Sequence, residues 1–130
     1  MTDPIFGDPI HTYTRAQAIE DGDLVLIERE ESIALFRHPV CFTRALWNHV
    51  EVPKGMEGMQ DLKGRQWDVL WLAHLAAKCG KATDIVPFKV IMAKLGAKKQ
   101  WLQPTLKLRI HVGPGDTPEP VITIGFPEDF

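Results

Sequence analysis

The sequence is poor in several residue types and patterns on which common functions depend. Its 130 residues include two cysteines, Cys41 and Cys79, and one serine, Ser32. Two cysteines do not make a disulfide framework, so we expect thiols in a reducing cytoplasm. The longest apolar runs, such as 69–73, are far too short to cross a bilayer. The N-terminus has no basic stretch before an apolar one, so we expect a cytoplasmic protein without a membrane partner.

The motifs of nucleophilic and metal catalysis are missing as well. No Gly-x-Ser-x-Gly elbow exists in the sequence. His38 and Cys41 have the spacing of two metal ligands, but no further Cys or His pair completes a four-ligand zinc site. We therefore expect no catalytic residue, no metal and no cofactor.

The composition is that of an ordinary folded domain. Hydrophobic residues make up 45% of the chain and charged residues 25%, which argues against disorder. A length of 130 residues is usual for one domain. We expect a single domain over 1–130, with an extended N-terminal arm over 1–11 and an internal loop over 51–60.

Helical signals dominate the first half of the chain. Thr14 and Gln17 match a capping box that starts a short helix, and Gly22 suits its end. A strand-length apolar run follows over 24–27, then one or two helical turns over 30–36. Pro39 suits the first position of a helix that we expect to run to about residue 50.

The strongest helical pattern spans 62–79, with a capping residue before it and Gly80 after it. Apolar residues cover most of its circumference, which predicts a helix at the centre of the core with Trp71 buried. His74 lies on this helix near Trp67 and Trp71. We interpret it as a structural residue that holds a carbonyl group, with a general base as the alternative.

The second half of the chain changes to the two-residue period of strands. Apolar and polar residues alternate over 88–92, 106–112 and 122–126. Such alternation is typical of half-buried antiparallel strands. We therefore predict an α+β fold, in which N-terminal helices pack on a small, mostly antiparallel C-terminal β-sheet with a 106–112/121–126 hairpin.

The stretch Gly113-Pro114-Gly115-Asp116 follows one predicted strand and precedes another. A phosphate loop needs several backbone N–H groups at the start of a helix, but Pro114 has no such donor. No Gly-Lys-Ser/Thr follows it. Glycine, proline and aspartate also suit tight turns, so we predict the bend of a hairpin.

Charge is unevenly distributed along the chain. Residues 1–36 carry eight acidic residues against two arginines, and residues 81–111 carry seven lysines and arginines against one aspartate. Within the basic 94–111 region, the candidate partner- or nucleic-acid-binding residues are Lys98, Lys99, Trp101, Lys107, Arg109 and His111. Cations around an aromatic ring suit a nucleic-acid backbone with a stacked base. A solvated sheet face explains the same pattern, and the net charge of −2 favours that explanation.

Three stretches carry a family resemblance: YTRAQAIEDGDLVLI (13–27), GRQWDVLWLAHLAA (64–77) and GPGDTPEPVITIGFPEDF (113–130). Together they resemble a family of small proteins encoded on bacterial plasmids, phages and other mobile elements, whose domain has no assigned function. The resemblance covers most of the chain. It implies a cytoplasmic accessory protein of a mobile element, and it brings no catalytic or binding residues with it.

Three hypotheses for the function follow. The first is a non-enzymatic module that binds another macromolecule, namely a protein of the host or of a competing element. The second is a nucleic-acid-binding protein that uses the basic 94–111 face. The third is a small enzyme whose site assembles from dispersed groups such as His49, Asp68 and His74. An exposed apolar patch would favour the first, a continuous basic face the second, and a deep pocket joining two titratable groups the third.

Overall fold

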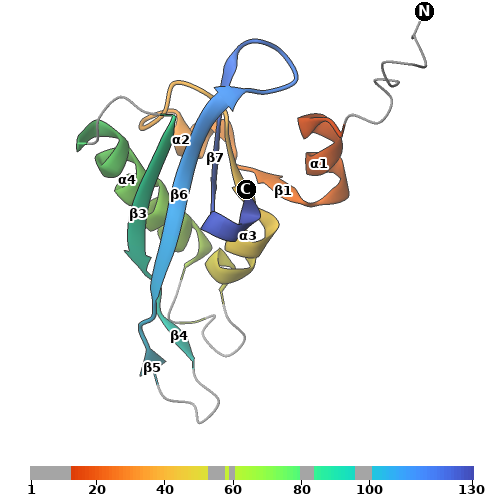
Figure 1. The fold of residues 1–130 in the computed structure, drawn as a ribbon. Coiled ribbons are helices and arrows are strands. Elements are labelled where there is room, and N and C mark those ends of the chain that lie inside the picture. Colours follow the sequence, from red (N-terminus) through yellow and green to blue (C-terminus); the bar gives the residue numbers. More distant parts are fainter. Residues whose placement is uncertain (1–12, 53–57, 59–60, 80–83, 96–100) are drawn as a thin grey trace, which may run out of the picture.

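The computed structural model describes residues 13–52, 58, 61–79, 84–95 and 101–130 (Figure 1). The helices are α1 (Arg15–Asp21), α2 (Arg29–Ser32), α3 (Arg44–Val50), α4 (Leu62–Cys79) and the short 3-10 helix η3 (Pro127–Asp129). The strands are β1 (Leu24–Leu26), β2 (Val40–Thr43), β3 (Ile85–Ile91), β4 (Lys94–Leu95), β5 (Trp101–Leu102), β6 (Thr105–Pro114) and β7 (Pro120–Gly125). The expected arm over 1–11 lies outside the described residues, as does most of the expected 51–60 loop.

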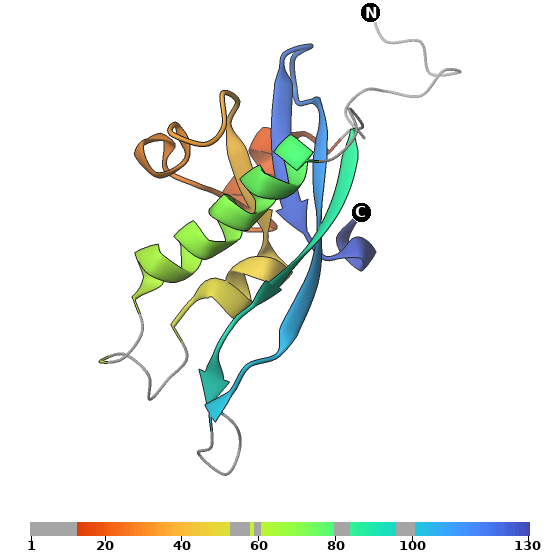
Figure 2. The same cartoon turned by 90° about the vertical axis from the view of Figure 1, so that its left-hand side faces the viewer.

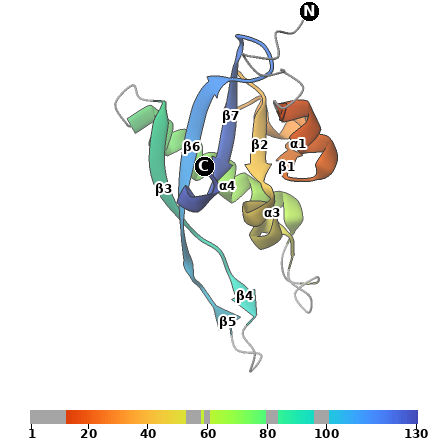
Figure 3. The same cartoon turned by 45° about the vertical axis from the view of Figure 1, so that its right-hand side comes forward.

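Five strands form one sheet in the order β1-β2-β7-β6-β3. The β2–β7 pair is parallel and the other neighbours are antiparallel, so the predicted α+β class with a mostly antiparallel sheet is confirmed. The predicted hairpin is β6–β7, in which Ile110 lies opposite Ile124. β4 and β5 form a separate two-stranded ribbon that extends beyond β3 and β6 (Figures 1 and 3).

The two faces of the sheet have different coverings. α3 and α4 lie on one face, here called the inner face, and the C-terminal turn with η3 lies on the other, the outer face (Figure 2). Strand β6 shows how the sequence sets these faces. Its apolar residues Leu106, Leu108 and Ile110 are buried, and the alternating Lys107 is exposed. The hydrophobic core therefore lies between the inner face and the two helices.

The start of the described chain follows its local signals. The Thr14 hydroxyl accepts a hydrogen bond from the Gln17 backbone N–H at 3.0 Å, and the Gln17 side chain accepts from the Thr14 N–H at 3.0 Å. Gly22 has φ 86°, the left-handed conformation that ends a helix without a Cβ clash. The predicted capping box and the predicted helix end are both confirmed.

Residues 39–50 differ from the helix predicted to begin at Pro39. Val40–Thr43 form strand β2, and α3 begins only at Arg44. All four β2 residues are buried, because β2 lies between β1 and β7. The Thr43 hydroxyl then accepts from the Leu46 N–H at 3.3 Å and caps α3. Burial in the sheet interior thus overrides the helix-start signal of the proline.

The placement of α4 also differs from expectation. One side of the helix packs on the sheet through Val69, Leu70 and Ala73, which have no exposed surface. The opposite side faces solvent, and Trp71 is 43% exposed. The prediction that Trp71 is buried is therefore wrong, since α4 covers one face of the sheet instead of lying at the centre of the core. None of the helices in the described part of the chain has both the length and the apolar character to cross a bilayer.

The C-terminal turn is fastened to the outer face at Gly125. The Asp129 carboxylate accepts hydrogen bonds from the Thr43 hydroxyl at 2.7 Å and from the Phe126 N–H at 2.8 Å. A Cβ at Gly125 would lie 2.4 Å from Cγ2 of Thr43, closer than side chains approach one another. Gly125 therefore permits the close approach that holds η3 against the sheet.

Candidate functional site

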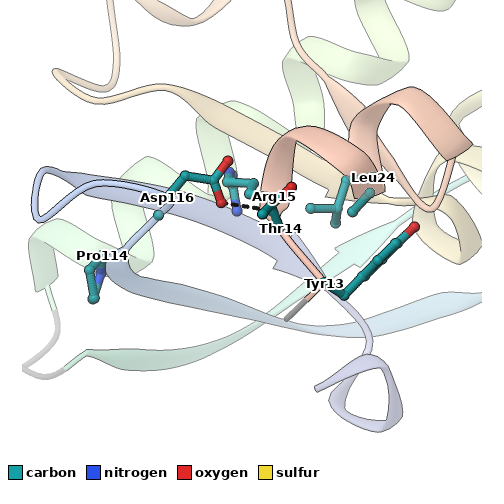
Figure 4. Close-up of a pocket in the computed structure, with 8 residues that line it drawn as sticks. Tyr13, Thr14, Arg15, Leu24, Pro114 and Asp116 are labelled. Atoms are coloured by element: carbon teal, nitrogen blue, oxygen red, sulfur yellow. Dashed lines mark hydrogen bonds between the residues drawn. The ribbon is translucent and has the colours of Figure 1, made fainter. Parts of the chain in front are cut away.

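The Gly113-Pro114-Gly115-Asp116 stretch joins β6 to β7 and also holds α1 in place. The Asp116 carboxylate accepts a hydrogen bond from the backbone N–H of Arg15 at 2.7 Å (Figure 4) and another from that of Ala16 at 3.0 Å. An aspartate at this position satisfies the free donors of a helix N-terminus and complements its dipole. The predicted hairpin bend is confirmed, and the first N–H groups of α1 are already occupied by a side chain of the same protein.

A hollow of about 480 Å³ lies between α1 and this bend (Figure 4), and its polar side chains have hydrogen-bond partners within the protein. The Arg15 guanidinium donates to the Thr123 hydroxyl at 2.6 Å and to the Ile122 carbonyl at 2.8 Å. The Tyr13 hydroxyl lies 2.6 Å from the Asp21 carboxylate and 2.8 Å from that of Asp23. Hydrogen bonding to these carboxylates raises the pKa of Tyr13. These contacts favour a structural junction, because the groups already have internal partners.

The outer face carries a cluster of three cations on adjacent strands, here called the basic cluster: Lys89, Lys107 and Arg109. Lys89 on β3 lies directly opposite Lys107 on β6, and Arg109 follows two residues later on the same face. Within the described residues, no carboxylate forms an ion pair with any of the three. Like charges directly opposite one another destabilise a sheet, so a bound anion would relieve the repulsion between Lys89 and Lys107.

The basic cluster surrounds a hollow of about 360 Å³. Pro87 and Pro127 contribute apolar walls, so the lining combines cations with flat aliphatic surface. Sequence reasoning identified Lys107 and Arg109 but missed Lys89. Lys89 joins the cluster through the register of β3 against β6, and the sequence alone does not show that register.

The remaining residues of the predicted basic face fall into three groups. Lys98 and Lys99 lie outside the described residues. Trp101 belongs to β5, and its side chain also lies outside them. His111 lies under Phe130, with the two rings stacked at a centroid distance of 3.5 Å. The structure therefore brings Lys107 and Arg109 together with Lys89, and places His111 beneath an aromatic ring.

Burial gives His111 a distinct electrostatic state. Its Nε2 is buried and has no hydrogen-bond partner among the described residues. Desolvation lowers the pKa of His111, and the nearby Arg109 charge lowers it further. His111 is thus held toward its neutral form and adds little charge to the basic cluster at neutral pH.

None of the five main hollows in the described part of the chain joins two of the three groups proposed for a dispersed active site. The His49 ring contacts Phe126 edge-on at 5.2 Å, and Asp68 is exposed on α4. His74 has its Nδ1 2.9 Å from the Leu35 carbonyl, as the structural interpretation predicted. No group of three metal-ligating side chains occurs in the part of the chain that the structure describes.

The solvent side of α4 carries an aromatic face, defined here as Trp67, Trp71 and Leu75. Their exposed fractions are 40%, 43% and 37%. The two indoles stack with centroids 6.3 Å apart and planes 13° apart, and Trp71 stacks in turn on His74 at 5.8 Å. The four-residue spacing places all three side chains on one stripe. The sequence analysis assigned Trp71 to the core instead, because apolar residues cover most of the helix circumference.

The family comparison covers nearly the whole chain. Residues 5–130 match a family described as a family of unknown function (DUF6573). Comparisons with curated proteins and with solved structures gave no match.

Proposed function

Since the chain belongs to the DUF6573 family, whose function is unknown, we propose a function from its surface: the protein binds another protein through the aromatic face of α4. The observation that carries this proposal is the stacked, solvent-exposed pair of Trp67 and Trp71. Contiguous exposed apolar surface marks interaction sites on soluble proteins. Tryptophan is also strongly enriched among the residues that dominate binding energy.

The rigidity of the face supports the same conclusion. Trp71 lies between Trp67 and the His74 ring, and a hydrogen bond to the Leu35 carbonyl fixes His74. The side chains are therefore largely ordered before a partner arrives, which lowers the entropic cost of association.

The resemblance to proteins of plasmids, phages and other mobile elements supplies the setting. We propose that the chain is a non-enzymatic, cytoplasmic accessory protein of such an element, and that its partner is a protein of the host or of a competing element. Of the three hypotheses raised by the sequence, the exposed apolar stripe supports this one most directly.

Affinity capture followed by direct binding tests the proposal. Immobilised full chain is incubated with bacterial lysate, with and without nuclease, and captured proteins are identified and purified. We expect a purified partner to bind in calorimetry, and the double variant W67A/W71A to weaken that binding at least about tenfold. The control I91A removes an apolar side chain of β3 that is more exposed than either tryptophan, and should bind normally. Equal binding by W67A/W71A and the wild type would refute a role for the aromatic face.

A second candidate function is binding of a polyanion such as single-stranded nucleic acid. The observation that favours it is the unpaired basic cluster, in which Lys89 faces Lys107 with no carboxylate partner among the described residues. Each phosphate that the cluster neutralises should add about −0.7 to the slope of log K against log salt. We nevertheless expect oligonucleotides to bind weakly, near or above ~100 μM at physiological salt.

Oligonucleotide titrations at several salt concentrations test this second function. K107E/R109E reverses two charges of the basic cluster, and K78E makes one such reversal at an exposed position on α4. Micromolar binding that K107E/R109E abolishes and K78E preserves would replace the protein-binding proposal with a nucleic-acid function. Circular dichroism of each variant confirms that the fold is intact.

A further inference from the structure

A hollow of about 430 Å³ lies between the C-terminal half of α4, residues 35–38 and the inner face of the sheet. This volume lies within the range of small-molecule binding sites. The hollow is distinct from the aromatic face, although His74 touches both.

The lining of this hollow is apolar at its floor. Val86, Ile110, Val112 and Ile122 come from three adjacent strands, and Ala77 comes from α4. Ile110 and Ile122 are almost completely buried. Such a floor suits an aliphatic group, because it offers dispersion contacts and no polar partner.

The charged residues of the lining all have one sign. Arg37 and Lys78 are exposed and His38 is half-buried, and no aspartate or glutamate among the described residues lines the hollow. The Arg29 guanidinium donates hydrogen bonds to the backbone carbonyls of Arg37 and His38, so the cationic segment is held in place. A ligand with an anionic end meets attraction here without repulsion from any lining residue.

His74 lines the hollow with its ring in a defined orientation. Its Nδ1 lies 2.9 Å from the Leu35 carbonyl, which can only accept, so Nδ1 carries the proton in the neutral ring. Phe36 contacts the ring edge-on at 6.0 Å and Trp71 stacks on it. The ring is therefore fixed in orientation where it lines the hollow.

We propose that this hollow binds an amphipathic anion of the fatty-acid class. The aliphatic chain occupies the apolar floor over β3, β6 and β7, and the carboxylate lies between Arg37 and Lys78 at the mouth. This site is independent of the aromatic face, so a failed search for a protein partner leaves it untouched.

The chain-length dependence of binding follows from burial of methylene groups. Each methylene that enters the floor should tighten binding about fourfold until the hollow is filled. Octanoate, decanoate and dodecanoate, each below its micellar concentration, are the probes. We expect saturable shifts of the Val86, Ile110, Val112 and Ile122 methyl signals, and a change in tryptophan fluorescence because Trp71 stacks on His74.

Matched variants separate the head-group contacts from the chain contacts. R37E/K78E should weaken binding of decanoate at least about fivefold, because it reverses the two exposed charges at the mouth of the hollow. Binding of decanol should not change, because decanol carries no charge. K89E makes the same kind of change on the outer face and should alter neither. A77F places a ring in the hollow and should abolish binding of both probes.

The outcomes decide the proposal directly. Decanoate and decanol of equal affinity, or decanoate binding that R37E/K78E leaves unchanged, would overturn the assignment of an anionic ligand. Shifts that fail to saturate, or that A77F leaves unchanged in a variant folded by circular dichroism, would overturn the assignment of the hollow itself.

Discussion

The carboxylate of Asp116 and the backbone N–H of Arg15 are joined by a 2.7 Å hydrogen bond across 101 positions of sequence. This bond, with its companion to Ala16, connects the β6–β7 bend to the start of α1. The acidic residue of the bend thus acts as a helix cap supplied from a distant part of the chain. The Gly113-Pro114-Gly115-Asp116 stretch resembles a phosphate loop in composition. It supplies an anion of its own, the Asp116 carboxylate, to the N-terminus of α1.

Replacing Asp116 should therefore loosen α1 and leave the hairpin in place. We expect D116A to lower the free energy of unfolding by about 1 kcal/mol, the usual cost of losing a helix cap. Hydrogen exchange at Arg15 and Ala16 should accelerate more than exchange within β6. The control E119A changes a neighbouring exposed residue of the same bend. Equal effects of the two substitutions would contradict the capping role.

Truncation of two adjacent residues of α4 should destabilise the protein to very different extents. Leu70 is fully buried, so L70A should cost 2–5 kcal/mol, roughly the range for a core leucine. Trp71 is exposed and stacks on Trp67 and His74, so W71A should cost below about 1.5 kcal/mol. Urea denaturation measures both values. A loss of several kcal/mol for W71A would place Trp71 in the core.

Among the charged residues of α4, Arg65 should be the one whose replacement lowers the free energy of unfolding most. It is 3% exposed, and its guanidinium donates to the carbonyls of Val50 at 2.9 Å, His49 at 2.7 Å and Ala93 at 2.8 Å. R65A would remove the donor from all three carbonyls, of which that of Val50 lies in a buried contact, so we expect a loss of about 3 kcal/mol or more. R65K should recover only part of this loss, because an ammonium group lacks the planar fork of donors.

The exposed residue Lys63, two positions earlier, is the matched control for Arg65. Its only ion pair among the described residues is a surface contact to Glu31 at 3.4 Å. K63A should therefore change the free energy of unfolding by less than about 1 kcal/mol. A similar small effect of R65A would show that the three carbonyls find other donors.

Local signals in the sequence were enough to predict several elements. The capping box of Thr14 and Gln17 and the end at Gly22 depend on residues within one helical turn, and the structure has both. The alternation over 106–112 likewise predicted β6, because a two-residue period is a property of one strand alone.

Features that depend on distant partners could not be predicted in this way. Val40 pairs with Ile122 in the parallel β2–β7 ladder, so the position of β2 inside the sheet depends on residues far along the chain. The opposition of Lys89 and Lys107 likewise depends on strand register. The sequence did not predict which side of α4 is exposed, for a different reason. Trp71 is as apolar as Leu70, and hydrophobicity alone does not say which of them meets the sheet.

The pH dependence of stability should contain a contribution from His111. Burial and the Arg109 charge place its folded-state pKa below the ordinary value of 6.5, which the unfolded chain retains. As the pH falls from 6.5 toward the folded-state pKa, the unfolded chain therefore binds a proton that the folded chain does not. The free energy of unfolding therefore keeps this contribution in full above pH 6.5 and loses it as the pH falls from 6.5 to the folded-state pKa. Below the folded-state pKa, His111 causes no further loss.

The variant H111F removes this titration and keeps a ring that can stack on Phe130. We expect the free energy of unfolding of the wild type to fall more steeply than that of H111F between pH 7.5 and pH 5. R109Q, which removes the neighbouring charge, should raise the pKa of His111 toward its ordinary value. NMR titration of the His111 ring measures this pKa directly in each protein. A His111 pKa at or above 6.5 in the wild type would show that the ring is hydrated, and that Phe130 does not cover it in solution.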